Sequence, residues 1–390
     1  MFKGSVVLAR YEFFPFIYAL LLTVKNVGIP TVFILKTLQM KNGIVENKGF
    51  TRIMASVAFF LVQFTFILSA DMDIINSLIN PLVLKTADNI DYHIYKLGFM
   101  QMNYGVSQSI WLLKLIAQLI IGFIAYFVLY SISKSSFSNN FDFENISQVS
   151  QNVNPAGLIA PALYSLFIIW FVFKPLVIDG LKGIFGSAVL FQSHILSSFI
   201  LYIIVYRLIA LASVPISVLM SKSILTEGGF GKFARFIFIF LFIAGGMGIH
   251  QYIFIRNIGL INTLLCFIPY YIIPVTNSLV LAIILYHRKF DSETEELSFA
   301  WKAAFSLGII QFVKMWNSEY IPLVFMLRQD RMPPVLLSKV LAQGLNAGGI
   351  DLPALLGMDL LVSVLPVVLF LIFRRFITEW ILLAYTKIRY

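Results

Sequence analysis

Long apolar runs are the feature of this sequence that most restricts its fold. A helix that crosses a bilayer needs about 20 mostly apolar residues, and about nine such runs follow one another along the chain. Of the 390 residues, 59% are hydrophobic and 12% are charged, whereas soluble domains average about 45–50% and about 25%. A water-soluble fold of this length could not bury so much apolar surface. The sequence therefore predicts an all-α, polytopic membrane protein.

A polar stretch separates the apolar runs into two groups. Residues 133–156 are rich in Ser, Asn and Gln, which is typical of a linker, here expected on the cytoplasmic side. We expect residues 1–132 to hold about three spans and residues 157–390 about six. The expected spans are residues 13–38, 53–70, 106–132, 158–177, 195–220, 233–249, 261–286, 303–326 and 352–373.

The distribution of basic residues indicates membrane orientation rather than nucleic-acid binding. The formal net charge is +10, but Lys and Arg gather in short loops between apolar runs, as the positive-inside rule describes for cytoplasmic ends. Residues 71–104 and 328–351 are then expected outside. The basic regions taken as cytoplasmic lie within residues 41–52, 222–235, 288–289 and 374–389.

The N-terminus fits this orientation poorly. Counting the spans backwards places Lys3 and Arg10 outside, against the positive-inside rule. A broken hairpin over residues 13–38 would remove the conflict, but its arms of about 13 residues would each be only about 20 Å long. We therefore favour a single kinked span there.

No group of residues in the sequence predicts catalysis or metal binding. The single cysteine, Cys266, cannot form a disulfide framework, and the four histidines lack metal-ligand spacing. A Gly-Lys-Ser/Thr phosphate-binding loop is absent, so ATP hydrolysis would have to come from partner subunits. Asp88, Asp91 and His93 are the group that a membrane enzyme could use. We expect no catalytic residue, no metal site and no cofactor.

Charged side chains inside the apolar runs are candidates for function, because ionised groups are costly in a bilayer. Lys114 lies near the start of its run, where its side chain could extend toward the membrane surface. Lys314 and Asp359 fall in the last two runs, and we favour an ion pair that would offset part of the cost of burying both charges. Lining of a polar path is the alternative. The predicted intramembrane charges are Lys25, Arg207, Lys314, Glu319 and Asp359.

Pro269 and Pro274 interrupt the apolar run over residues 261–286, and the polar residues 276–278 follow them. A proline inside a helix removes a backbone hydrogen bond and produces a kink. In a membrane, such a break is tolerated only where it faces protein or a cavity. We therefore expect this break to face away from lipid.

Short motifs follow one another in an order that carries a family resemblance. In the second part they are IAGGMGI at 243–249, IGLINTLL at 258–265, WNSEYIPL at 316–323 and PPVLL at 333–337. In the first part they are VKNVG at 24–28, LQ at 38–39, NPLV at 80–83, ADNIDYHIYKLG at 87–98 and NYG at 103–105. The second part resembles the permeases of maltose-type ABC importers, particularly the branch that imports complex oligosaccharides. The first part is similar to the last part of the partner permease.

The resemblance implies that one chain carries both membrane halves of an importer, with the first half reduced to about three spans. In that family the two halves face each other around a central path, a solute-binding protein delivers sugar from outside, and two ATPase subunits dock inside. The resemblance therefore implies a hetero-oligomeric complex in a bacterial-type cell membrane. Its expected partners are cytoplasmic ATPase subunits and an external solute-binding or surface protein.

The loops that would contact an ATPase depart from the family pattern. Such permeases carry a cytoplasmic Glu-Ala-Ala pattern followed by Gly, which forms a short coupling helix. The loop over residues 40–49 has no such pattern, and residues 288–304 keep at most a remnant with no Gly after it. We expect both coupling helices to be lost or shortened. The residues of these degenerate loops are Gly43, Glu46, Gly49, Glu295 and Glu296, with Ala303 and Ala304 in the remnant.

Three functions stay open from the sequence. The chain could be a permease-like subunit of a different ATP-driven assembly, which we favour because both loops have changed. It could be a conventional carbohydrate importer whose divergent coupling helices dock through the acidic run 291–296. The third possibility covers a transporter driven by ion gradients and a non-transporting membrane scaffold.

A sugar path through the protein would need groups that bind sugars. Sugars stack on aromatic rings and form hydrogen bonds with amides, so such residues near the proline break and near residue 316 are the candidates. Packing between helices is the alternative role for each of them. The residues expected along the path are Tyr270, Tyr271, Asn277, Trp316 and Asn317.

Overall fold

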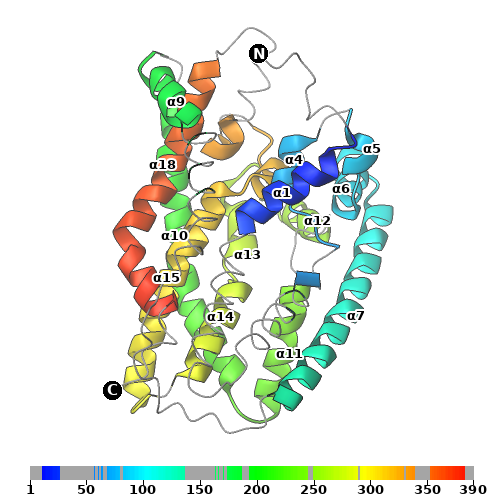
Figure 1. The fold of residues 1–390 in the computed structure, drawn as a ribbon, viewed down its shortest axis with the longest axis vertical. Coiled ribbons are helices and arrows are strands. Elements are labelled where there is room, and N and C mark those ends of the chain that lie inside the picture. The colour runs from blue at the N-terminus through cyan, green and yellow to red at the C-terminus, as the bar shows by residue number, and fades with distance from the viewer. Residues whose placement is uncertain are drawn as a thin grey trace. The chain divides into compact units, whose positions relative to one another are not determined.

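The computed structural model describes the chain as a set of helices. No strand occurs among the residues that it describes, so the all-α prediction is confirmed for them. The described residues are 11–26, 57, 60, 63–64, 68–79, 82–136, 163, 166, 170, 174–186, 193–244, 249–288, 290–328, 331–338 and 352–382. In chain order the helices are α1 (Phe14–Asn26), α4 (Met72–Leu78), α5 (Leu84–Ala87), α6 (Ile90–Tyr95), η2 (Lys96–Met100), α7 (Tyr104–Ser136), α9 (Lys174–Gly186), α10 (Ser193–Leu225), α11 (Gly229–Ile243), α12 (Ile249–Asn257), η6 (Leu264–Cys266), α13 (Phe267–Tyr271), α14 (Val275–His287), α15 (Glu293–Asn317), α16 (Tyr320–Phe325), α18 (Leu352–Ile377) and η9 (Thr378–Leu382) (Figure 1).

Four helical segments in the described part of the chain are long and apolar enough to cross a membrane. Each coincides with a run expected from the sequence, and the chain is therefore of the multi-pass membrane type. A shorter apolar segment lies in α1, and the runs expected over residues 53–70 and 158–177 fall largely outside the described residues. The long segments are Tyr104–Val128, Ile195–Leu225, Leu264–Tyr286 and Pro353–Ile381.

Two expected spans differ from the helices observed. The run over residues 303–326 is divided by a break at Ser318 and Glu319, which separates α15 from α16. Helix α15 also begins earlier than the run, at Glu293. The early start follows from capping: the Ser292 hydroxyl accepts the backbone N–H of Glu295 at 3.2 Å. The run over residues 233–249 corresponds to α11, which ends at Ile243.

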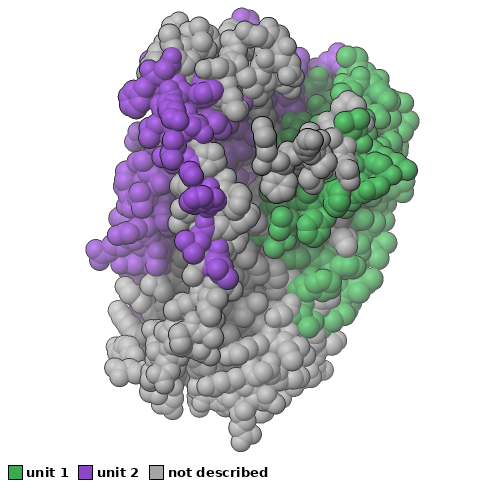
Figure 2. Space-filling view, turned by 45° about the horizontal axis from the view of Figure 1, so that its top comes forward, with its two compact units in different colours: residues 1–151, 239–254 green, residues 152–238, 255–390 purple. Residues whose placement is uncertain are grey.

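The chain divides into two compact units, which Figure 2 colours separately. The first comprises residues 1–151 and 239–254, and the second comprises residues 152–238 and 255–390. The division after residue 151 falls within the expected linker. The start of that stretch is nevertheless helical, because α7 continues to Ser136.

In the first unit, short helices contact one another and the long helix α7. Phe14 of α1 packs with Val83 and Ala87. Between α6 and α7 the chain makes the π-helical turn η2, which approaches α7 closely. A Cβ atom on Gly98 would lie 2.7 Å from the Ser107 hydroxyl oxygen, so this contact favours glycine.

In the second unit, α10 lies along α14 and α15, and α18 lies along α9 and α15 (Figure 1). The core between α10, α14 and α15 places valines of α10 and large aliphatic side chains of α14 against α15, which contributes three alanines beside Phe299 and Leu307. Small residues allow helices to approach closely in membrane proteins. The buried core residues include Val214, Val218, Leu281, Ile284, Leu285, Ala300, Ala303 and Ala304.

Asn262 holds the loops at the end of the second unit where α15 finishes. Its φ of 61° lies in the left-handed region, which Asn adopts more readily than most residues. Its backbone N–H donates to the Phe325 carbonyl at 2.9 Å, and its own carbonyl accepts from Arg331 at 3.1 Å. The Tyr202 hydroxyl of α10 donates to the Arg331 carbonyl at 2.5 Å. These bonds fix the segment that begins at Arg331.

Candidate functional site

A polar pocket of about 340 Å³ lies in the second unit, between the end of α15, the start of α16 and α18. Three residues that the sequence singles out, Asn317, Glu319 and Asp359, line this pocket together. Asn317 and Glu319 come from the break after α15, and Asp359 comes from α18, which lies later in the sequence. Two hydroxyl groups and three aliphatic side chains complete the lining, namely Ser338, Ser363, Val335, Leu355 and Val362.

The break after α15 positions Asn317 and Glu319. Ser318 is extended, with φ −78° and ψ 129°, and it ends the helix. Glu319 then precedes α16, and its carbonyl accepts the N–H of Leu323 at 2.9 Å. On a continuous helix, residues two apart would differ by about 200° in direction. The break therefore allows both polar side chains to line the same pocket.

Asp359 and Ser363 reach the pocket from α18. They are four residues apart, so they lie on the same face of that helix. Trp316 joins α15 to α18 beside them, since its indole N–H donates to the Val362 carbonyl at 2.9 Å and its side chain is 1% exposed. This contact holds the end of α15 against the pocket-lining part of α18.

The pocket can form hydrogen bonds and attract positive charge. Its carboxylates, amide and hydroxyls can pair with the hydroxyls of a polyol, and the carboxylates favour a cation. The described residues that line it include no aromatic ring. Within the described residues, no group of three or more His, Cys, Asp or Glu could hold a metal ion. The lining therefore suits a small hydroxyl-rich or cationic organic solute.

Two of the residues expected along a sugar path, Tyr271 and Asn277, take part in hydrogen bonds between helices. Tyr271 and Asn277 are buried, and Tyr270 is half-buried beside them. The Asn277 amide nitrogen donates to Gln311 Oε1 at 3.1 Å and to the Leu307 carbonyl at 3.3 Å. Gln311 Nε2 donates in turn to the Tyr271 carbonyl at 3.0 Å. These bonds link α13, α14 and α15.

The same bonds satisfy the backbone at the proline break. Pro274 has no N–H. The N–H of Val275 donates to the carbonyl of Ile273, so it does not donate to the Tyr271 carbonyl four residues earlier. Gln311 supplies a donor there. The break faces protein, as the sequence predicts. Sequence reasoning missed Gln311, although a lone amide inside an apolar stretch of α15 was a signal that could have identified it.

The predicted intramembrane charges lie in different surroundings. Arg207 is exposed on α10, three residues before residue 210, the midpoint of Ile195–Leu225. No carboxylate among the described residues pairs with it. Lys314 is exposed on α15, and its pairing with Asp359 stays a prediction. The side chain of Lys25 lies outside the described part of the structure.

Lys114 forms an ion pair rather than extending to the membrane surface. Its ammonium lies 2.5 Å from Asp91 Oδ1, and the two side chains are 9% and 17% exposed. The other carboxylate oxygen of Asp91 accepts the N–H of Ala70 at 2.7 Å. One turn further along α7, Gln118 donates to the Ser69 hydroxyl at 2.7 Å. These contacts join α6 and α7 to the segment before α4 within the first unit.

The acidic and histidine residues near α6 do not converge on one point. Asp88 Oδ1 lies 3.5 Å from His93 Nδ1, and both side chains are partly exposed. Asp91 bonds instead to Lys114. Tyr92 is buried here, and burial, followed by the nearby charge of Asp88, raises the pKa of its hydroxyl. Among the described contacts of these residues, the arrangement offers a single Asp–His pair and no nucleophile beside it.

The remnant of the second coupling loop forms the start of α15. Ser292 caps the helix at Glu295, and the Glu296 carboxylate lies 4.0 Å from the Lys222 ammonium. Ala303 and Ala304 lie further along the same helix, inside the core. The remnant is thus part of a long packed helix. The first loop, with Gly43, Glu46 and Gly49, lies outside the described residues.

Comparisons of the chain with protein-family models, with curated proteins and with solved structures found no match. The family resemblance therefore rests on the sequence motifs alone. The geometry that bears on function is that of the polar pocket and of the start of α15.

Proposed function

We propose that this chain is a membrane-embedded, permease-like subunit of an ATP-driven complex, related to oligosaccharide ABC importers, whose coupling loops are lost or altered. The observation that carries the proposal is the polar pocket, because Asn317, Glu319 and Asp359 line one volume of about 340 Å³. Hydrogen-bonding groups of this kind at the end of a helix bundle suit a subunit that receives a polar solute. The positive-inside rule places this end of α15 and α18 outside.

The interior of the second unit supports a role that other subunits complete. Asn277 and Gln311 are 8% and 9% exposed, and they form hydrogen bonds in the region where the sequence places a sugar path. A solute passing through this unit alone would have to break them. We therefore place the route of a solute along a face that other subunits complete, in a hetero-oligomeric complex.

The start of α15 supports altered coupling. A coupling helix must present a free surface to an ATPase. Ala303 and Ala304 are 0% and 1% exposed, so they cannot do this without unpacking the core. An ATPase would therefore contact other cytoplasmic segments or bind through another subunit.

The proposed surroundings follow from the orientation. The chain would lie in a bacterial-type cell membrane, with ATPase subunits on the side of Lys222 and Arg374. An external solute-binding or surface protein would contact the side of the polar pocket. Both partners would be proteins, and we expect no nucleic-acid partner.

A conventional carbohydrate importer with divergent coupling helices is the second candidate. It is favoured by the acidic first turn of α15, which carries Glu293, Glu295 and Glu296. Glu293 is exposed, as is Asp291 just before the helix. An acidic patch could bind a basic groove on an ATPase. A non-transporting scaffold is the third candidate, and it would leave the polar pocket without a solute.

Affinity purification from native membranes tests the proposal. We expect an ABC-type ATPase to co-purify with the tagged chain, and a preparation that never contains one would contradict the proposal. The double variant Asp291→Asn/Glu293→Gln should retain the ATPase, whereas a conventional importer docking through this run should lose it. The matched control is Glu227→Gln, another exposed carboxylate between α10 and α11.

A second experiment addresses the pocket. In the purified complex we expect Glu319→Gln/Asp359→Asn to abolish stimulation of ATP hydrolysis by external solute while assembly is retained. A scaffold would show no such stimulation in the unmodified complex.

A further inference from the structure

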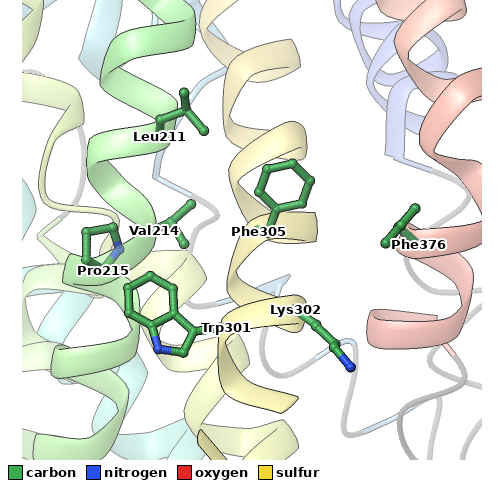
Figure 3. A pocket seen from close by; sticks show the side chains of 7 residues that line it. All are labelled: Leu211, Val214, Pro215, Trp301, Lys302, Phe305 and Phe376. Atoms are coloured by element: carbon green, nitrogen blue, oxygen red, sulfur yellow. The ribbon is translucent and has the colours of Figure 1, made fainter. Parts of the chain in front are cut away.

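A second pocket, of about 410 Å³, lies in the second unit between α10, α15 and α18, and it has no role in the proposed function. Figure 3 shows Leu211 and Val214 pointing from α10, and Phe376 from α18, toward α15. Lys302 extends from α15 on the side of α18. Pro215, Trp301 and Phe305 complete the lining.

The pocket is apolar and accessible from outside the unit. Trp301 is 43% exposed, Phe305 37% and Leu211 44%. Lys302 is the one charged residue among the described residues that line the pocket. Hydrocarbon tails are as apolar as leucine, so such a hollow in a membrane-spanning bundle is suited to contact with lipid.

The position of the pocket along the spans matches the course of a lipid tail. Residue 367 is the midpoint of Pro353–Ile381, so Phe376 lies nine residues from it, or about 14 Å along the helix. The hydrocarbon core of a bilayer has a half-thickness of about 15 Å, which places Phe376 near its edge. Leu211 lies one residue from the midpoint of Ile195–Leu225. The pocket therefore runs from the membrane interface toward the bilayer centre.

Lys302 lies at the interfacial end of the pocket. Its ammonium is 4.9 Å from the centre of the Trp380 ring, and Trp and Lys are both typical of the membrane interface. No carboxylate among the described residues pairs with Lys302. Arg374 and Arg375 lie in the last turn of α18, so this is its basic, cytoplasmic end. An ammonium at this depth attracts an anionic headgroup.

The pocket is too small to enclose a membrane-spanning helix. A helix with its side chains is about 10 Å wide and rises 5.4 Å per turn, so one turn fills about 420 Å³. The pocket could hold about one such turn, whereas a membrane-spanning helix needs about 20 residues. A flexible acyl chain can enter a hollow of this volume without a larger complementary surface.

The geometry points to a binding site for an anionic phospholipid, with one acyl chain in the pocket and the phosphate at Lys302. The chain contributes the apolar groove from α10, α15 and α18, and the charge from α15. The site does not depend on the transport of a solute, so the lipid experiment can fail while the proposed function stands. The experiments on the proposed function can likewise fail while the lipid site stands.

The test uses the full chain in lipid nanodiscs and acyl chains labelled with bromine, which quenches nearby tryptophan fluorescence. The chain has five tryptophans, so the Trp301 signal is the difference between the unmodified chain and Trp301→Phe. The nanodiscs contain phosphatidylcholine with a rising fraction of phosphatidylglycerol. In one series the phosphatidylglycerol carries the bromine, and in the other series the phosphatidylcholine carries it. We expect brominated phosphatidylglycerol to quench Trp301 at about five-fold lower mole fraction than brominated phosphatidylcholine, as expected for one interfacial lysine.

Substitutions at Lys302 test whether this residue causes the preference for phosphatidylglycerol. Lys302→Gln should abolish it and Lys302→Arg should retain it. The control Lys232→Gln removes an exposed charge from α11 and should change nothing. If Lys302→Gln fails to fold, high salt takes its place, because screening should reduce the preference of the unmodified chain.

Three results would overturn the inference. One is equal quenching by the two lipids, which would indicate only the general lipid contact of any membrane protein. Another is an unchanged preference in Lys302→Gln or at high salt. The last is protection of Trp301 from both lipids, which would indicate that a protein segment covers the pocket.

Discussion

At the scale of residues, Gln311 joins three helices through one amide group. It accepts from Asn277 and donates to the Tyr271 carbonyl, which the proline break deprives of the N–H of residue 275. The sequence predicted that the break faces protein, and it placed Asn277 along a sugar path with helix packing as the alternative. A lone amide in the apolar stretch of α15 pointed to Gln311, but its bonding partners depend on how α15 packs against α13 and α14. The same is true of Trp316, whose partner is a backbone carbonyl of α18.

Loss of this amide should destabilise the protein. We expect Gln311→Leu to lower the free energy of unfolding by about 1–3 kcal/mol, because buried polar groups of Asn277 and Tyr271 lose a partner. Thermal unfolding in detergent measures the effect. Gln101→Leu, at an exposed position, is the control. Equal stability of the two variants would show that the network contributes nothing.

Replacing Arg207 should stabilise the protein, in contrast to replacing Gln311. Arg207 is exposed near the midpoint of a span and lacks a carboxylate partner among the described residues, and Arg at a helix centre costs about 2.5–3.5 kcal/mol on the insertion scale. We expect Arg207→Leu to raise the unfolding temperature of the isolated chain in detergent. Arg374→Leu, at the end of α18, should change it little. A lower unfolding temperature for Arg207→Leu would mean that the guanidinium makes a stabilising contact within the chain.

At the scale of elements, strong hydropathy made the long helices predictable, and local capping limited the accuracy of their ends. Four expected runs coincide with long apolar helices. The start of α15 was misplaced because Ser292 initiates the helix within a polar segment that hydropathy excludes. The polar pocket was predictable only as separate residues. Its assembly depends on the break at Ser318 and on the contact of α15 with α18.

The packing of α9 on α18 gives a test at this scale. A Cβ atom on Gly183 would lie 1.7 Å from the Pro353 carbonyl oxygen, so the helices would have to separate. We expect Gly183→Ala to destabilise the protein by about 1–3 kcal/mol. Gly186→Ala, whose Cβ would meet nothing within 4 Å, should be neutral or stabilising by up to about 1 kcal/mol. Unfolding measurements that fail to separate the two variants would contradict this packing.

The contact of α12 with α7 should depend on pH. The His250 ring lies 4.5 Å from the Trp111 ring, and partial burial lowers the pKa of His250 below its unfolded value of about 6.5. Between the two pKa values the unfolded state binds more protons, so stability is retained above about pH 6.5 and falls as the pH drops through this window. The effect should be small, because the ring stays partly exposed.

Unfolding temperatures at about pH 7.5 and about pH 5.5 measure the effect of His250. The decrease at the lower pH should shrink in His250→Gln and persist in His93→Gln. An equal decrease in His250→Gln and the unmodified chain would assign the pH dependence to other groups.

At the scale of the whole molecule, the chain is an all-α membrane protein that we propose to be one subunit of a larger assembly. The described residues include a polar pocket at the end that the charge distribution places outside, and a packed helix where a coupling loop was expected. Neither feature by itself supplies ATP hydrolysis or a complete solute path. Both therefore require partner subunits in the proposed function.

A density map of the native complex would reveal what contacts residues 40–52 and 288–302, and it is the sharpest test of a permease-like subunit with altered coupling. We expect ATPase density on the cytoplasmic side, with its contacts made outside a coupling helix formed by either segment. A complex without an ATPase, or an ATPase seated on a coupling helix formed by residues 40–52 or 288–302, would contradict it.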